Sequence, residues 1–199
     1  MRNDEIAYII SQYTPLLDEK EEFETRINWG QTQFFFECVK NNDYSKLHHF
    51  KRIRGENNVP PLYFANGQCD LPDDFQKEEY LYYLLDGVQV RINLTNDRMF
   101  EMLKTNRLVK TNPKNPIANI QSNYIRLLPT TVHFVVMSYL TSPTPIKYAV
   151  TTDQGYPQYD ANNSQELLWD VDDQVAIIML VLKSIGITAT KDDIKDKSR

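Results

Sequence analysis

The sequence predicts an α+β protein in which N-terminal helices pack with a mainly antiparallel β-sheet or sandwich and a buried helix lies near the C-terminus. Three observations support this class. Apolar residues recur at helical spacing in the N-terminal segment, Asp86-Gly87 separates two strand-like runs, and a very apolar helix opens at Asp170 and ends at Gly186. A chain of 199 residues can hide about 70% of its extended surface on folding, so it can build a core without disulfides or metals.

Two helices are predicted at the N-terminus. The first ends just before Pro15, which disfavours helical backbone in the residue that it follows, and its apolar stripe consists of Ile6, Ile9, Ile10 and Tyr13. The second covers about residues 18–41 and begins with a capping box formed by Asp18 and Glu21. Glycine inside a helix costs up to about 1 kcal/mol relative to alanine, so we expect a close helix crossing or a bend at Gly30.

The middle of the chain predicts a hairpin and a short helix. Asp86-Gly87 tolerates positive φ and therefore suits a two-residue turn between strands at 81–85 and 88–92. Thr95 is expected to cap a helix that runs to about Leu103, and the buried side of this helix would carry Met99, Met102 and Leu103.

Three further strands are expected after a polar, proline-bearing stretch. They lie at 117–128, 131–140 and 146–152, separated by Pro129 and by Pro143-Thr144-Pro145. The strand at 131–140 is apolar on both faces, which is typical of a central strand covered on both sides.

These elements predict four segments: a helical layer over 1–54, a linker over 55–70, a strand-rich domain with the C-terminal helix over 71–187, and a mobile tail over 188–199. The linker is rich in Asn, Gly and Pro. The tail is charged and has Ile194 as its one apolar anchor, so it is expected to be disordered alone.

Composition and charge argue against several classes of function. The net charge of −5 does not suit a protein that holds nucleic acid along its whole surface. Cys38 and Cys69 have no spacing typical of zinc and are expected to be reduced thiols. The longest apolar run, 175–182, is far shorter than the roughly 20 residues that a bilayer requires, and the N-terminus lacks an apolar leader, so no membrane association is predicted.

Acidic and histidine residues offer little catalytic chemistry. Asp70, Asp73 and Asp74 invite a metal or acid-base hypothesis, but a turn set by Pro72 explains them as well. Asp170, Asp172 and Asp173 fit the N-cap and first turn of the C-terminal helix, where negative charge is favourable. His48 and His49 are expected to point apart on a helix, and a metal site built with Cys38 would lack a fourth ligand. We therefore assign no catalytic, cofactor-binding or metal residues and predict no enzyme activity.

Two segments are candidate interfaces. The run His48 to Arg54 is basic with an interleaved aromatic residue, so Lys51, Arg52 and Arg54 are expected to form a solvated rim or to contact an acidic neighbour or a DNA backbone. The run Val175 to Leu182 is apolar on every side of its helix. Either the sheet and N-terminal helices of the same chain or a neighbouring subunit must cover its far face.

The order of these features resembles that of a family of virion proteins. The features are two N-terminal helices, Leu71-Pro72-Asp73-Asp74-Phe75, the hairpin, the crossing at 113–118, the strand exit at 139–145, and the helix ending in Lys183-Ser184-Ile185-Gly186-Ile187. In this order they resemble the head-to-tail adaptor proteins (ring or tail-tube connectors) of short-tailed phages, including crAss-like phages. The resemblance implies a structural protein of the virion, assembled in the host cytoplasm, that forms a ring of identical copies, commonly twelve, between the portal protein and the tail proteins.

The resemblance also implies roles for the segments. Helices would pack neighbour to neighbour, the strand-rich part would face further tail components, and the lumen would make only non-specific contact with DNA. The tail would reach an adjacent ring, where Ile194 inserts into a pocket and charged residues pair at its rim; these are Lys191, Asp192, Asp193 and Lys195. Two alternatives remain at this point: another capsid- or tail-associated binding module, and a metal-dependent hydrolase that uses Asp70, Asp73 or Asp74.

Overall fold

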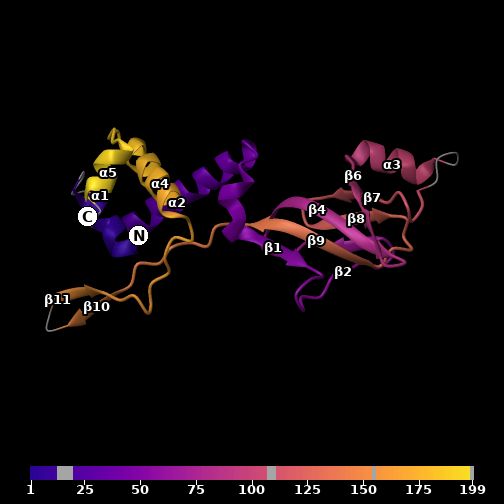
Figure 1. Cartoon of the computed structure of the whole chain (residues 1–199), viewed down its shortest axis with the longest axis horizontal. Helices are drawn as coiled ribbons and strands as arrows, with labels where there is room; N and C mark the ends of the chain where they lie inside the picture. Colours follow the sequence, from indigo (N-terminus) through magenta and orange to yellow (C-terminus); the bar gives the residue numbers. More distant parts are fainter. Residues whose placement is uncertain (13–19, 107–110, 154–155, 198–199) are drawn as a thin grey trace. The chain divides into compact units, whose positions relative to one another are not determined.

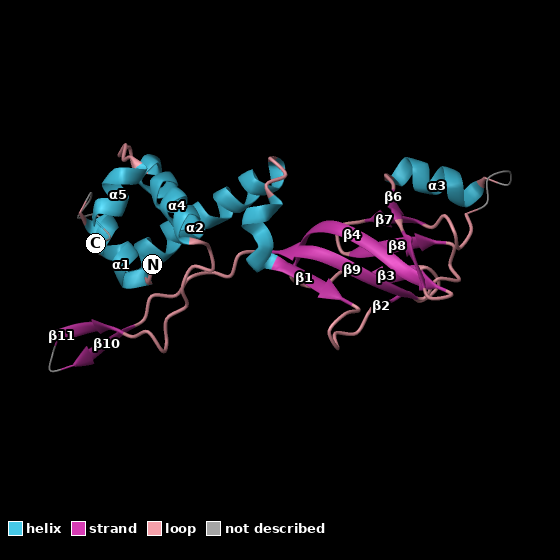
Figure 2. Cartoon of the chain, viewed as in Figure 1, coloured by secondary structure: helices cyan, strands magenta, loops and turns pink. Residues whose placement is uncertain are grey.

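The computed structural model describes residues 1–12, 20–106, 111–153 and 156–197 (Figure 1). Helices make up 37% and strands 29% of the chain, which confirms the predicted α+β class (Figure 2). The chain forms two compact units. Residues 1–49 and 143–199 make one, here called the helical unit, and residues 50–142 make the other, here called the β unit.

The helical unit combines both ends of the chain. It contains α1 (Asn3–Ser11), α2 (Lys20–Lys40), α4 (Val171–Ser184), α5 (Lys191–Lys197) and a two-stranded ribbon of β10 (Val150–Asp153) and β11 (Tyr156–Tyr159). The apolar helix α4 packs against α1, α2 and α5. The core is built from large apolar side chains with at most 3% of their surface exposed, among them Ile6, Ile9, Ile10, Phe23, Ile27, Phe35, Ile177, Ile178, Val181 and Leu182.

Gly30 lies where α2 crosses α4, as its position in the sequence suggested. A Cβ atom at this position would lie 2.7 Å from Cγ2 of Val181 and 3.3 Å from Cγ2 of Ile177. Both side chains are fully buried, so the two helices approach more closely here than any larger residue permits. The predicted close crossing is confirmed.

The second N-terminal helix agrees with its predicted range, whereas the first ends at Ser11, earlier than the predicted end just before Pro15. Helix α2 covers Lys20–Lys40 where 18–41 was expected. Tyr13 and the predicted cap residue Asp18 lie outside the described residues. A 3-10 helix, η2 (Tyr44–Phe50), then leads out of the helical unit.

The β unit is a sandwich of two sheets. One sheet has the order β1 (Lys51–Arg54), β9 (Phe134–Thr141), β4 (Phe75–Leu85), β5 (Val88–Arg91), with β2 (Leu62–Tyr63) also paired to β9. The other has the order β3 (Gln68–Asp70), β8 (Tyr124–Leu128), β7 (Ile117–Ile120), β6 (Asn93–Leu94). All pairs are antiparallel except β6 with β7. Side chains of both sheets meet in one core, which includes Phe64, Leu81, Ile125, Leu127, Val135 and Met137.

Two strand predictions are confirmed. Asp86 has φ of 51° and Gly87 has φ of 80°, the pair of positive values that a tight hairpin turn requires, and Leu85 pairs with Val88 across it. Strand β9 lies between β1 and β4, and its residues after Phe134 are all buried, as expected for a central strand.

Other local predictions are wrong. Residues 55–70 are not a plain linker, because they contain β2, β3 and the fully buried Phe64. The strand expected at 117–128 is two strands, β7 and β8, which pair with each other. Of the strand expected at 146–152, only the end lies in β10. These errors arise because strand pairing, and not apolar content alone, decides where a strand begins.

Helix α3 (Asp97–Thr105) differs from its prediction in its cap and its buried face. The cap is Asn96, whose Oδ1 accepts a hydrogen bond from the Met99 amide at 2.9 Å. The buried residue is Phe100, whereas Met99 and Met102 are about half exposed, at 46% and 54%. Asn is as good a cap as Thr or better, so the helix begins one residue later than expected.

The predicted division of the chain also differs from the observed one. The segment 143–187 was expected to belong to the strand-rich domain, but it lies in the helical unit. Asn28 accepts a hydrogen bond from the Ile146 amide at 2.7 Å, and Glu24 accepts one from the Tyr148 amide at 2.6 Å. Polar side chains of α2 therefore hold this returning segment, and α4 finds its apolar partners among helices.

Candidate functional site

An open apolar groove lies on the surface of the helical unit. It has a volume of about 430 Å³ and is lined by Phe34, Glu37, Ala176, Met179, Leu180, Lys183, Ile187, Thr188, Ala189 and Lys191. Most of α4 is covered by the chain itself, but Ala176, Met179 and Leu180 are only partly buried. The chain therefore leaves one strip of its most apolar helix uncovered. Charged residues of both signs, Glu37 and Lys183, stand at its rim.

An aromatic stripe lies on a different face of α2. It consists of Trp29 and Phe36, which are 44% and 52% exposed and stand two helical turns apart. At about 100° per residue, both lie roughly 200° around the helix from Phe34, which lines the groove. Glu37, which also lines the groove, lies only about 100° from Phe36, so the groove and the stripe are different but adjoining faces of α2.

The basic cluster predicted as an interface is divided and partly neutralised. His48 and His49 end η2 in the helical unit, while Lys51, Arg52 and Arg54 lie on β1. Lys51 Nζ is 2.8 Å from a carboxylate oxygen of Glu79, and this bond raises the pKa of Lys51. The acidic neighbour of Lys51 is thus in its own chain.

The C-terminal tail is not a free segment in this structure. Residues 191–197 form α5, and Ile194 is fully buried within its own chain. Asp193 and the Thr190 hydroxyl exchange hydrogen bonds with each other's amides at 2.8 and 3.2 Å, which is a capping box. Lys195 pairs with Asp172 at 2.7 Å.

The prediction that the tail is disordered alone, with Ile194 left for another ring, is therefore wrong for the described residues. The cap at Thr190 and the buried side chain of Ile194 together stabilise α5. The high charge content of this segment did not predict a helix.

The first group of aspartates singled out from the sequence is Asp70, Asp73 and Asp74. Asp73 and Asp74 lie in a turn closed by a hydrogen bond from the Phe75 amide to the Pro72 oxygen, as the turn interpretation predicted. Asp74 also accepts a hydrogen bond from the Tyr139 hydroxyl at 3.0 Å. In the described parts of the chain, no metal-holding group of three includes Asp70, Asp73 or Asp74. The hydrolase alternative thus has no geometric support here.

The second group is Asp170, Asp172 and Asp173, and helix capping accounts for the positions of these aspartates only in part. Asp170 is the N-cap residue of α4, but its side chain makes no capping hydrogen bond. Asp172 pairs with Lys195, and this lowers the pKa of Asp172. Burial raises the pKa of Asp173, and Lys46 at 4.0 Å partly opposes the shift.

The two cysteines are free thiols, as expected. Burial raises the pKa of Cys38 to about 11 and also raises the pKa of Cys69. Because the thiolate is the nucleophile and the metal ligand, neither thiol is prepared for such chemistry at neutral pH.

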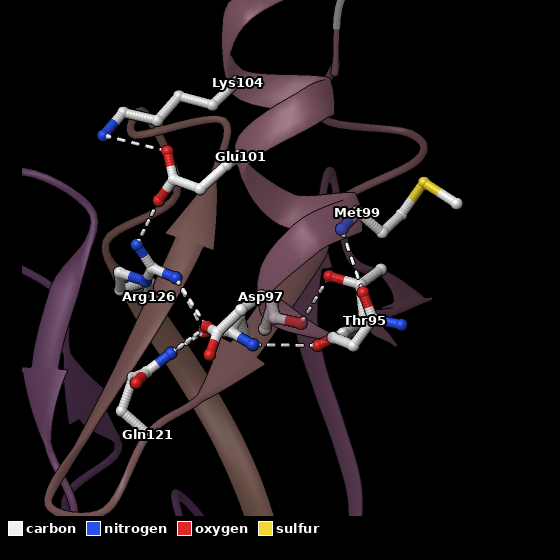
Figure 3. Close-up of polar contacts among 10 residues, drawn as sticks. Thr95, Asp97, Met99, Glu101, Lys104, Gln121 and Arg126 are labelled. Carbon is white, nitrogen blue, oxygen red and sulfur yellow. Dashed lines mark hydrogen bonds and ion pairs between the residues drawn. The ribbon is translucent and has the colours of Figure 1, made fainter.

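A polar cluster that the sequence did not predict fixes α3 on the second sheet. Arg126 of β8 reaches two carboxylates on α3: it lies 2.9 Å from Asp97, and it also pairs with Glu101 (Figure 3). Its guanidinium lies 4.6 Å from the ring centroid of Phe100. Asn119 accepts a further hydrogen bond from it at 2.9 Å. Nη1 and Nη2 of Arg126 are engaged by its own chain, while Nε is buried without a hydrogen-bond partner. The contacts of Nη1 and Nη2 position α3 on the sheet.

No protein-family model matches the sequence, and no curated protein shows significant similarity to it. Within the described part of the chain, no helix combines the length and the apolarity needed to cross a membrane.

Proposed function

We propose that the chain is a structural virion protein, a head-to-tail adaptor whose identical copies form a ring between portal and tail. The order of its elements, which resembles that of such adaptors, supports this proposal. Its two separately packed units also suit an adaptor, because one unit can bind its own copies while the other binds a different protein.

The apolar groove and the aromatic stripe carry the proposal. A surface that binds its own counterpart across a two-fold axis closes a dimer, whereas two different surfaces on one subunit produce head-to-tail association and rings. The groove and the stripe are different surfaces of the helical unit. The occupant that we propose for the groove is a second copy of this chain, which inserts Trp29 and Phe36.

The size of these surfaces fits the centre of a larger interface. A large aromatic side chain buries about 150–250 Å² when it is wholly covered. Because Trp29 and Phe36 are only about half exposed, the stripe supplies roughly a quarter of the about 800 Å² that each partner buries in a standard interface. Tryptophan at the centre of an interface, surrounded by a polar rim, is typical of a binding hot spot. Glu37 and Lys183 at the rim of the groove would fix the register of the contact.

The β unit provides a separate surface for the tail proteins. Leu84 and Val88 at the hairpin end are 61% and 65% exposed, and Tyr63 and Phe134 on paired strands are 58% and 61% exposed. Contact with DNA in the lumen would be weak, since Lys51 is already paired within the chain, and non-specific, since contacts to phosphates do not read sequence.

Charge substitutions in the groove and the stripe test the proposal. A groove variant, Met179→Glu with Leu180→Glu, and a stripe variant, Trp29→Glu with Phe36→Glu, should each be monomeric under conditions where the natural chain forms rings. Trp29 and Phe36 are about half exposed, and Met179 and Leu180 are partly buried, so circular dichroism must show that each variant is folded before its copy number is compared. Native mass spectrometry gives the copy number, and Val88→Glu in the β unit is the control that should still form rings.

Mixing the two variants distinguishes head-to-tail contact from other modes. The groove variant keeps an intact stripe and the stripe variant keeps an intact groove, so the mixture should form a heterodimer and nothing larger. If both variants still form rings, or if the mixture stays monomeric while the natural chain forms rings, the groove and the stripe are not the contact.

A further inference from the structure

Two histidines and an aspartate converge on the surface of the helical unit. His48, His49 and Asp170 each offer one potential ligand atom, and these three atoms lie within 4.8 Å of one another. All three residues are exposed. We expected the histidines to point apart, but their ring centroids are 3.8 Å apart, with 40° between the ring planes. The premise on which we assigned no metal residue is therefore wrong.

The distance between His49 and Asp170 fits a metal better than a hydrogen bond. Nε2 of His49 is 3.4 Å from Oδ1 of Asp170. A hydrogen bond assisted by charge would be about 2.7–2.9 Å long. Two ligands of a tetrahedral zinc ion, each with a bond of about 2.0–2.1 Å, stand about 3.3 Å apart.

One ring nitrogen of His48 is held by its own backbone. Its Nδ1 lies 3.0 Å from the backbone oxygen of Ser45. A carbonyl oxygen only accepts, so Nδ1 donates in this contact, and in the neutral ring Nε2 carries the lone pair. A hydrogen bond of this kind to a backbone carbonyl is the usual outer support of a zinc-binding histidine.

Asp170 is also positioned for this role. As the N-cap residue of α4, it would normally use its side chain to accept a hydrogen bond from the helix amides, but it makes no such bond and lies beside His49 instead. Asp173 is close enough to interact electrostatically with Asp170, and Lys46 at 4.0 Å from Asp173 partly compensates its charge.

We infer that His48, His49 and Asp170 form a surface site for a divalent transition-metal ion of the zinc class. Two imidazole nitrogens and one carboxylate oxygen are ligands that zinc accepts. Three protein ligands leave at least one position for water or for a group from another molecule. The site is independent of the proposed ring, because it uses neither the apolar groove nor the aromatic stripe.

Calorimetric titration of the full, untagged, chelator-treated chain with Zn²⁺ tests the site. One ion should bind per chain. His49→Ala and Asp170→Asn should each weaken binding by about 100-fold or more, since loss of even an outer-shell partner costs about 10- to 100-fold. Asp170→Asn keeps a good capping residue, so its melting temperature should not change.

Matched controls separate this site from general binding to histidines and acids. His133→Ala removes the remaining histidine, which lies in the β unit, and Asp172→Asn removes a carboxylate two positions from Asp170. Both should bind Zn²⁺ as the natural chain does. The inference is overturned if the natural chain takes up no Zn²⁺, or if His49→Ala and Asp170→Asn bind it unchanged.

Discussion

Gly30→Ala is expected to lower the free energy of unfolding by about 1–3 kcal/mol, the usual cost of overpacking a core. The added methyl group would lie 2.7 Å from Cγ2 of Val181, and this side chain is branched at Cβ and fully buried, so it has little room to move. Alanine gains about 0.5–1 kcal/mol over glycine in helix propensity. The steric cost is the larger effect, and urea denaturation followed by circular dichroism measures the difference.

A control on the same helix separates packing from propensity. Gln33 lies on the exposed face of α2, so Gln33→Ala should change the free energy of unfolding by no more than about 0.5 kcal/mol. Gly30→Val should be less stable than Gly30→Ala. If Gly30→Ala proves as stable as the natural chain or more stable, the close crossing of α2 and α4 does not exist.

Ile194→Ala is expected to release α5 from the helical unit. Truncation of a fully buried isoleucine costs about 2–5 kcal/mol, and Ile194 is the buried residue of α5. A seven-residue helix is too short to persist without tertiary contacts. The backbone amides of α5 should therefore lose protection from hydrogen exchange, while those of α2 and α4 keep theirs.

The loss of global stability in this variant is limited to the free energy that docks α5, because the helix can detach without unfolding the rest. Asp196→Ala, at an exposed position of the same helix, is the control and should keep full protection. Equal protection in Ile194→Ala, or no protection of α5 in the natural chain, would show that the tail is mobile, as its composition suggested.

The elements that the sequence predicted well are those with local physical causes. The turn at Asp86-Gly87 follows from residues that tolerate positive φ, and the end of α4 at Gly186 follows in the same way, since its φ is 83°. The close crossing at Gly30 follows from the cost of glycine inside a helix. Each of these signals is contained in a few neighbouring residues.

The features that the sequence did not predict depend on residues far apart in the chain. Asp170 and His49 are separated by 121 positions, so no spacing rule brings them together. Arg126 meets α3 from a strand more than 20 positions later, and its partners are ordinary charged residues of a surface helix. The assignment of 143–187 to the helical unit likewise depends on hydrogen bonds with α2, which periodicity along one segment does not reveal.

The central claim is that copies of this chain associate head to tail into a closed ring. Negative-stain electron microscopy of the purified natural chain, over a range of concentrations and with and without a portal protein encoded in the same genome, tests it most directly. We expect closed rings of one size, either alone or on the portal, with the helical units in contact around the ring. A chain that remains monomeric in both conditions at every concentration, or that forms only two-fold dimers, would contradict the claim.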